Sequence, residues 1–219
     1  MNLENIEMDA NPFSIVDIEH WERKPLFDHF SKTRMPHYAV SAYIDVTRLL
    51  EYKRAHGLSF YLSLVYLVTE SLNNIDEFHY RIIDGQVVWY SRIETNFTHK
   101  RPEERVFRFC TAPFEGSLEE YVAATSDMIA RQTTLFGGMG DIANVAYCTC
   151  VPTLDLTAST NPGMDNPDDA IPRINWGKYV WREGRWMLNI TVMANHRFID
   201  GYHLGLFYNG LQTLIDQLG

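Results

Sequence analysis

Hydrophobic residues recur at helical spacing in three parts of the sequence. Between Ser59 and Asn74 they occupy nearly every side of the helical turn, which predicts a buried helix rather than a surface helix. A second helix is predicted from the apolar positions between Leu204 and Leu218, and a third between Asp17 and Phe30. Pro25 lies inside the third segment, so it either limits that helix or begins a second one.

Alternating and β-branched positions predict strands in much of the remaining sequence. The clearest case is a hairpin, in which two short strands flank Asp84-Gly85, a dipeptide favoured in two-residue turns. The predicted strands cover Tyr38–Val46, Tyr80–Ile83, Gln86–Tyr90, Val145–Leu156, Lys178–Trp181 and Trp186–Ala194, and one or two more lie within Glu94–Thr111. A charged loop at Lys100–Arg105 interrupts the last of these segments.

Capping and loop residues mark the boundaries between these elements. Ser117 and Glu120 form a Ser-x-x-Glu capping box, which predicts a helix that runs to about Gln132. A flexible glycine loop follows at residues 137–140, and a long polar loop is predicted over Thr157–Pro172.

Helices and mostly antiparallel strands mix without a clear linker, so we expect a single α/β domain over residues 13–219. Residues 1–12 are acidic and polar, which predicts a loose leader rather than a signal peptide. The three cysteines, Cys110, Cys148 and Cys150, favour reduced thiols in the cytoplasm over a disulfide framework. No accompanying set of ligands completes a zinc site, so we expect no metal.

Composition and charge exclude several classes of function. The chain has 219 residues, of which 46% are hydrophobic and 21% are charged, so it can bury a core and is not disordered. A formal net charge of -9 disfavours nucleic acid or an anionic membrane surface as partner. A local basic patch would still suffice for an anionic cofactor. No apolar run approaches the length that spans a bilayer.

The strongest candidate for chemistry is the stretch Asn195 to Gly201, between the last predicted strand and the last helix. One residue there is a histidine, His196, and histidine as a residue type suits proton abstraction from a hydroxyl, because an unperturbed imidazole titrates near neutral pH. Asp200 could cap the helix or hold a cation, and Gly201 permits a tight backbone. From spacing alone, a structural role for His196 carries more weight than a catalytic one. Metal ligation is disfavoured because no second histidine lies at ligand spacing.

The string His196-x-x-x-Asp200-Gly201 resembles the signature shared by chloramphenicol acetyltransferases and the catalytic domains of 2-oxo-acid dehydrogenase acyltransferases. Further segments resemble the first family, in family order and over nearly the whole chain. They are Val16–Lys24, Phe60-Tyr61, Asp76–Phe78, Asp84–Trp89, Gly177–Tyr179 and Gly201–Gly205. The resemblance implies the CoA-dependent acyltransferase fold, with a mixed, mostly antiparallel sheet covered by helices. It also implies a homotrimer whose active sites lie at the subunit interfaces.

The reaction implied by this resemblance moves an acetyl group from acetyl-CoA, the co-substrate, to a small-molecule hydroxyl, by default that of chloramphenicol. His196 takes the role of general base, and no acyl-enzyme forms. Asp200 pairs with Arg23 and holds the histidine loop. Thr149 occupies the position of a serine whose hydroxyl stabilises the oxyanion. A strand threonine whose hydroxyl is satisfied locally is about as compatible with the sequence.

The resemblance also implies a coenzyme site. Lys178 and Tyr179 match residues that contact the nucleotide portion of the coenzyme, and Tyr61 is expected to line its tunnel. Asn175 takes the position of a second hydroxyl that acts through water. Ser59 replaces a basic residue, so one phosphate contact is expected to be missing. The alternative for Lys178 is that it contacts only solvent, as an exposed lysine on a strand usually does.

The acceptor pocket departs most from the family. Phe30, His37 and Ala39 stand where drug-acetylating relatives present an aromatic, a small residue and another aromatic, and Phe107 is expected as a pocket wall. Asn195 replaces a second histidine, so the Asn-His-Arg string leans toward the dehydrogenase acyltransferases. The acceptor therefore stays open between chloramphenicol and another alcohol or thiol. A non-catalytic ligand-binding relative is the alternative from another class, and a lipoyl-linked acyltransferase is less favoured.

Overall fold

The computed structural model describes residues 13–137, 143–162 and 165–219. The leader expected over residues 1–12 lies outside the described residues, as do Gly138 and Gly140 of the predicted glycine loop. The helices are α1 (Lys24–Ser31), α2 (Thr47–His56), α3 (Phe60–Asn73), α4 (Leu118–Arg131) and α5 (Gly201–Asp216), with 3₁₀ helices η1 (Ile18–His20) and η2 (Asp76–His79). The strands are β1 (Phe13–Ile15), β2 (His37–Asp45), β3 (Tyr80–Ile83), β4 (Gln86–Tyr90), β5 (Glu94–His99), β6 (Arg108–Ala112), β7 (Phe136–Gly137), β8 (Val145–Cys150), β9 (Arg173–Trp176), β10 (Val180–Arg182) and β11 (Arg185–Asn195).

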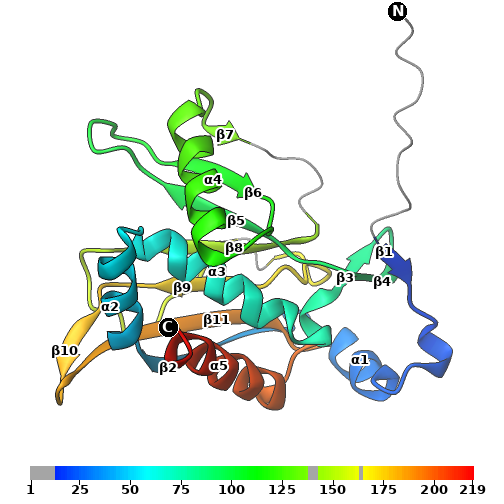
Figure 1. Cartoon of the computed structure of the whole chain (residues 1–219). Coiled ribbons are helices and arrows are strands. Elements are labelled where there is room, and N and C mark those ends of the chain that lie inside the picture. Colours follow the sequence, from blue (N-terminus) through cyan, green and yellow to red (C-terminus); the bar gives the residue numbers. More distant parts are fainter. Residues whose placement is uncertain (1–12, 138–142, 163–164) are drawn as a thin grey trace, which may run out of the picture.

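A large sheet organises the molecule (Figure 1). Its strands follow the order β10-β11-β9-β8-β5-β6-β7, and β2 pairs along the opposite edge of β11. The pairs β5–β8, β8–β9 and β6–β7 are parallel, and the other pairs are antiparallel. A second sheet has the order β1-β4-β3 and is antiparallel throughout. The expected mixed, mostly antiparallel sheet is therefore confirmed.

The helices cover one face of the large sheet and close the hydrophobic core. Figure 1 shows α2, α3 and α5 along the same side of the sheet, while α4 lies beside β6. Helix α3 lies at the centre of this layer, next to α2, α4 and α5. It is buried on most sides, as its nearly continuous apolar sequence predicts, and Ser59 caps its first turn.

Local sequence signals account for several element boundaries. The Asp84-Gly85 turn has φ angles of 50° and 77°, the left-handed conformation that a tight two-residue hairpin requires. Both hydrogen bonds of the Ser117–Glu120 capping box are present at the start of α4. The segment predicted as one helix over residues 17–30 is divided, because Pro25 occupies the first turn of a new helix, α1.

One further prediction from the sequence is wrong, and some elements of the structure were not predicted at all. The strand expected over Val145–Leu156 ends at Cys150, shortly before Pro152, because proline cannot donate to a strand ladder. Strand β9 was not predicted, since its four residues adjoin a long polar loop. Helix α2 was missed because charged residues dominate it and only Leu49 and Leu50 are buried.

Candidate active site

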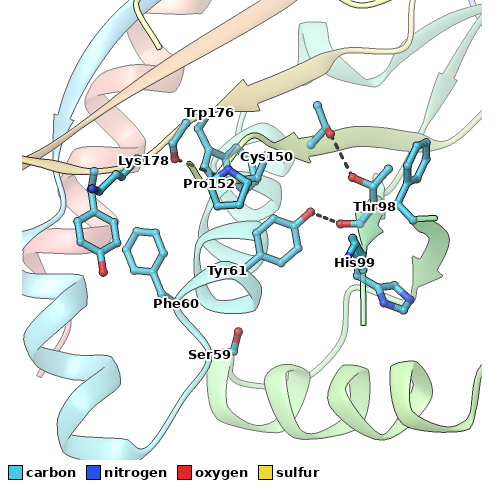
Figure 2. Close-up of a pocket in the computed structure, with 14 residues that line it drawn as sticks. Ser59, Phe60, Tyr61, Thr98, His99, Cys150, Pro152, Trp176 and Lys178 are labelled. Atoms are coloured by element: carbon cyan, nitrogen blue, oxygen red, sulfur yellow. Dashed lines mark hydrogen bonds between the residues drawn. The ribbon is translucent and has the colours of Figure 1, made fainter. Parts of the chain in front are cut away.

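A cavity of about 840 Å³ lies where β5, β8 and β9 end and α3 begins. Aromatic, hydroxyl and basic side chains from segments far apart in the sequence converge on it (Figure 2). Five predicted site residues line this cavity: Tyr61, Phe107, Thr149, Lys178 and Tyr179. Ser59, at the predicted site of the missing basic residue, lines it too.

A bulge in the sheet turns the predicted coenzyme residues toward this cavity. Residues 177–179, between β9 and β10, stand opposite only residues 188–189 of β11. Such an extra residue interrupts the alternation of side chains and redirects them. Gly177 is required at this point, because a Cβ would collide with the carbonyl oxygen of Leu154. The lysine and the tyrosine that follow this glycine both line the cavity.

Thr149 lies near the end of β8 and lines the cavity. Its Oγ1 atom lies 3.1 Å from Oγ1 of Thr98, on β5. The hydroxyl of Tyr61, on α3, donates a 2.8 Å hydrogen bond to the carbonyl oxygen of Thr98 (Figure 2). Burial raises the pKa of Tyr61, which keeps the phenol protonated and able to donate. Three separate elements thus fix the surroundings of the Thr149 hydroxyl.

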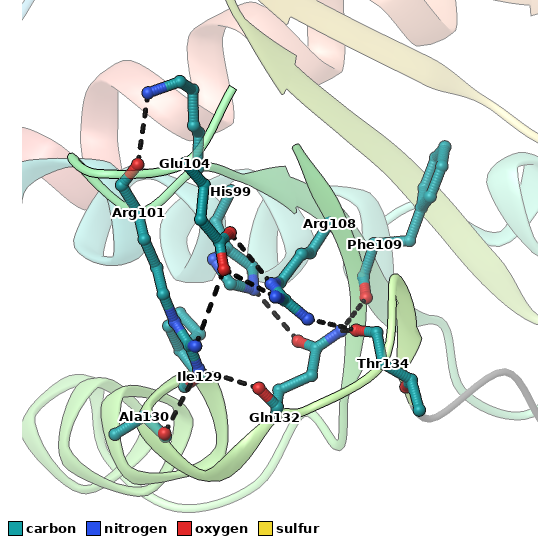
Figure 3. Close-up of polar contacts among 10 residues, drawn as sticks. His99, Arg101, Glu104, Arg108, Phe109, Ile129, Ala130, Gln132 and Thr134 are labelled. Carbon is teal, nitrogen blue, oxygen red and sulfur yellow. Dashed lines mark hydrogen bonds and ion pairs between the residues drawn. The ribbon is translucent and has the colours of Figure 1, made fainter. Parts of the chain in front are cut away.

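The charged loop predicted at Lys100–Arg105 leads into one wall of the cavity, and it is attached to α4 (Figure 3). Arg101 donates to three carbonyl oxygens at the carboxyl end of α4, the shortest bond being 2.7 Å. Glu104 accepts two hydrogen bonds from Arg108 of β6, at 3.0 and 2.5 Å. Phe107 follows this loop and lines the cavity.

His196 lies in the turn between β11 and α5. Its ring stacks between Phe30 and Tyr38, with ring centroids 4.0 and 4.5 Å away. The backbone N–H of His196 donates a 2.8 Å hydrogen bond to the carbonyl oxygen of Pro36. The Nδ1 atom is buried and has no hydrogen-bond partner among the described residues. A substrate can therefore reach only the other ring nitrogen, Nε2.

The predicted ion pair between Arg23 and Asp200 is present. Nη1 of Arg23 lies 2.9 Å from Oδ2 of Asp200, and Nε donates to the carbonyl oxygen of Arg197 at 2.9 Å. Asp200 also caps α5 by accepting a hydrogen bond from the Tyr202 amide. Burial alone would raise the pKa of Asp200, but the bonds from Arg23 and this amide hold the pKa below its ordinary value. Arg23 therefore holds the turn that carries His196 at two points, Arg197 and Asp200.

Asn195 joins this turn to the segment at residues 166–171. Its Nδ2 atom donates to the carbonyl oxygens of Pro167 and Asp169, at 2.9 and 3.0 Å. Its Oδ1 atom accepts from the amide of Arg197. The amide side chain is buried and fully engaged by backbone groups, so Asn195 acts here as a structural link.

The remaining predicted acceptor residues gather around His196 and do not line the cavity. His37 pairs with Asn195 across β2 and β11, and its Nε2 atom lies 2.7 Å from the carbonyl oxygen of Asp169. Ala39 lies two residues further along β2 and is exposed. Phe30 stacks on the ring of His196 and meets the ring of His29 edge-on.

Asn175 does not line the cavity either, although it stands beside Thr149 in the register of β8 and β9. It is buried, and its Nδ2 atom bonds to Oδ1 of Asn161. Its Oδ1 atom has no partner in the part of the chain that the structure describes.

His196 and Thr149 are far apart within one chain. Thr149 aligns through Asn175 with Thr191 of β11, five residues before His196. At about 3.3 Å per residue and 4.8 Å between strands, the two backbones are roughly 20 Å apart. One reacting group cannot contact both side chains of the same chain.

Sequence reasoning missed several residues of the cavity, among them Phe60, Thr98, His99 and Trp176. Thr98 could not be placed beside Thr149, because no local signal shows which strands pair in parallel. Phe60 and Trp176 are neighbours of residues that were predicted, so adjacency was the available signal. Within residues 13–137, 143–162 and 165–219, no cluster of His, Cys, Asp or Glu could hold a metal, and no helix could cross a membrane.

The chain has the fold of CoA-dependent acyltransferases. A truncated catalytic core of the 2-oxoacid dehydrogenase multienzyme complex from Thermoplasma acidophilum shares it, with a TM-score of 0.64 and 19% identity over 91% of this chain and 97% of that one. The chain belongs to the chloramphenicol acetyltransferase family, whose model matches residues 11–212.

Individual relatives agree with this placement. A solved chloramphenicol acetyltransferase superposes with a TM-score of 0.85 and 28% identity, over 93% of this chain and 99% of that one. The chloramphenicol acetyltransferase of Clostridium perfringens is 25% identical over 92% of this chain and 94% of its own length.

Proposed function

We propose that this chain transfers the acetyl group of acetyl-CoA to a hydroxyl of a small molecule, with chloramphenicol as the default acceptor. The cavity carries the proposal, because it brings a strand hydroxyl, Thr149, together with basic and aromatic side chains. Figure 2 shows Lys178 and His99 on opposite sides of this space. Family membership supports the same reaction, since the curated relatives are named for it.

In this reaction Nε2 of His196 takes the proton of the acceptor hydroxyl, and the alkoxide attacks the thioester carbonyl. Negative charge moves to the carbonyl oxygen, where the Thr149 hydroxyl donates a hydrogen bond to it. Collapse of this intermediate breaks the carbon–sulfur bond and transfers the acetyl group to the acceptor. The proton returns from His196 to the departing sulfur, so the protein is unchanged and no acyl-enzyme forms.

The separation of the two residues supports a site shared between subunits. His196 and Thr149 are roughly 20 Å apart within one chain, whereas both must lie within hydrogen-bond reach of the reacting atoms. We propose a homotrimer in which one subunit supplies His196 with Phe30, His37 and Ala39. The neighbouring subunit then supplies the cavity.

The coenzyme occupies the end of the cavity near Lys178 and Tyr179. The lysine offers a charge to a phosphate, and the tyrosine ring packs edge-on against Phe60, with centroids 5.0 Å apart. The unpartnered Oδ1 of Asn175 is a suitable acceptor for a water between it and Thr149. A cytoplasmic location fits the free thiols and the supply of acetyl-CoA.

A different alcohol or thiol acceptor is the second candidate. It is favoured by the departures near His196, where His37 and Ala39 replace the small residue and the aromatic of the drug-acetylating relatives. The chemistry would be unchanged, and only the shape of the acceptor would differ. A binding protein without turnover is the alternative outside the enzyme class.

Release of the coenzyme thiol, measured with acetyl-CoA and a panel of acceptors, tests the proposal. Turnover with chloramphenicol that His196→Ala abolishes and His56→Ala leaves intact would support it, because His56 is exposed at the far end of α2. Turnover with other alcohols or thiols only would change the acceptor. Acetyl-CoA binding without turnover of any acceptor would refute the enzymatic function.

A further inference from the structure

A row of hydroxyl and amide side chains crosses the large sheet at the level of the cavity. Strand register places its members side by side on β5, β8, β9, β11 and β2: Thr98, Thr149, Asn175, Thr191 and Ser41. Residues that are adjacent in register point to the same face of a sheet. The residues just before the first three, Phe97, Cys148 and Ile174, belong to the hydrophobic core. The row therefore lies on the face turned away from the helices.

Two members of this row, Thr98 and Thr149, line the cavity. Their hydroxyl oxygens are 3.1 Å apart, a hydrogen bond in which either oxygen could be the donor. Neither hydroxyl has a second partner among the described residues. The hydrogen of each hydroxyl is therefore directed either toward the other threonine or into the cavity.

The direction of this bond decides whether Thr149 can stabilise an oxyanion. A hydroxyl has one hydrogen, so Thr149 donates it either to Thr98 or into the cavity. A negative oxygen in the cavity requires the second arrangement, in which Thr98 donates to Thr149. Two hydroxyls bonded in sequence polarise each other, and the terminal one becomes a stronger donor.

We propose that Thr98 is a positioning residue, which orients the Thr149 hydroxyl toward the oxyanion and strengthens it as a donor. The inference rests on the proposed acetyl transfer and names a residue that this proposal did not include. Thr98 need not touch the substrate to act in this way.

The backbone of Thr98 is held independently of its side chain. Tyr61 donates a 2.8 Å hydrogen bond to the Thr98 carbonyl oxygen, and burial raises the pKa of this phenol. Thr98→Val keeps the shape of the side chain and removes only the hydroxyl. The substitution should therefore leave the strand and the cavity in place.

A double-mutant cycle in a steady-state thiol-release assay tests the inference. Thr149→Val should lower kcat by about 10²–10³-fold, the loss expected for one oxyanion donor, and Thr98→Val by about tenfold. The double variant should be no slower than Thr149→Val, because Thr98 acts through that hydroxyl. Thr98→Ser should keep most of the activity, and the KM for acetyl-CoA should stay unchanged throughout.

Equal kcat values for Thr98→Val and the wild type would overturn the inference. A double variant in which the two single losses multiply would also overturn it. If Thr98→Val does not fold, Thr98→Ala enters the same cycle. A wild type that acetylates no acceptor contradicts the proposed function, and the inference falls with it. An active wild type with an unaffected Thr98→Val variant contradicts the inference alone.

Discussion

The ion pair between Arg23 and Asp200 gives a prediction whose size follows from the structure. The side chains of Arg23 and Asp200 are 12% and 30% exposed. Breaking a fully buried pair costs about 3–5 kcal/mol, but Asp200 retains partial solvation and its bond from the Tyr202 amide. Arg23→Ala should therefore lower the free energy of unfolding by about 2–3 kcal/mol. It should also lower kcat/KM at least tenfold, because the His196 turn loses two of its attachments.

Urea unfolding at a fixed protein concentration measures the first effect, since oligomer stability depends on concentration. Arg54→Ala is the control, because Arg54 is exposed on α2 and makes no ion pair with any described residue. In a double-mutant cycle, the variant with both Arg23→Ala and Asp200→Asn should lose less unfolding free energy than the sum of the two single losses. If Arg23→Ala matches Arg54→Ala in stability and in kcat/KM, the role given to this pair is wrong.

The pKa of Asp200 adds a dependence on pH. A carboxyl whose pKa is lowered in the folded state stabilises that state above its unfolded pKa, near about 3.9. This contribution is lost as the pH falls through the folded-state pKa. The stability difference between the wild type and Arg23→Ala should therefore shrink in acid, and a difference that persists unchanged would contradict the assignment.

Three further substitutions test other parts of the site. Gly177→Ala should cost about 1–3 kcal/mol of stability and raise the KM for acetyl-CoA, because the new Cβ would collide with the Leu154 carbonyl; equal unfolding curves would refute this. Asn195→Ala should lower the free energy of unfolding by about 2–3 kcal/mol and lower kcat, because three hydrogen bonds of a buried amide are lost. An unchanged kcat would show that Asn195 does not position His196. Glu104→Gln should raise the KM for the acceptor at neutral pH. The hydrogen bond from Arg108 lowers the pKa of Glu104, so the ion pair is complete above the ordinary glutamate pKa and is lost as the pH falls below it. The KM values of the wild type and of Glu104→Gln should therefore converge in acid.

Much of the fold was predictable because its signals are local. The apolar sequence of α3, the Asp84-Gly85 turn and the Ser117 capping box each determine an element within a few residues. Strand β9 and helix α2 lacked such signals. Their place in the structure depends on packing against neighbours that are distant in the sequence.

The residues of the candidate site could be named from the sequence, but their arrangement could not. The sequence identified His196, Thr149 and Lys178 as candidates, but it could not show that the first lies far from the other two within one chain. Register between strands decides that distance, and register is a property of the folded chain. For the same reason Thr98 became visible only beside the strand that carries Thr149.

Mixing two variants that each lack one of these residues tests the shared site most directly. His196→Ala and Thr149→Val are co-expressed with different affinity tags, and the mixed oligomers are isolated and assayed for acetyl transfer. In a trimer, each mixed oligomer contains one site with both intact residues, one from each neighbour, so about one third of its sites are complete. Activity near that fraction of the wild-type value is the predicted result. Mixed oligomers no more active than the weakly active or inactive parents would contradict a site built from two subunits.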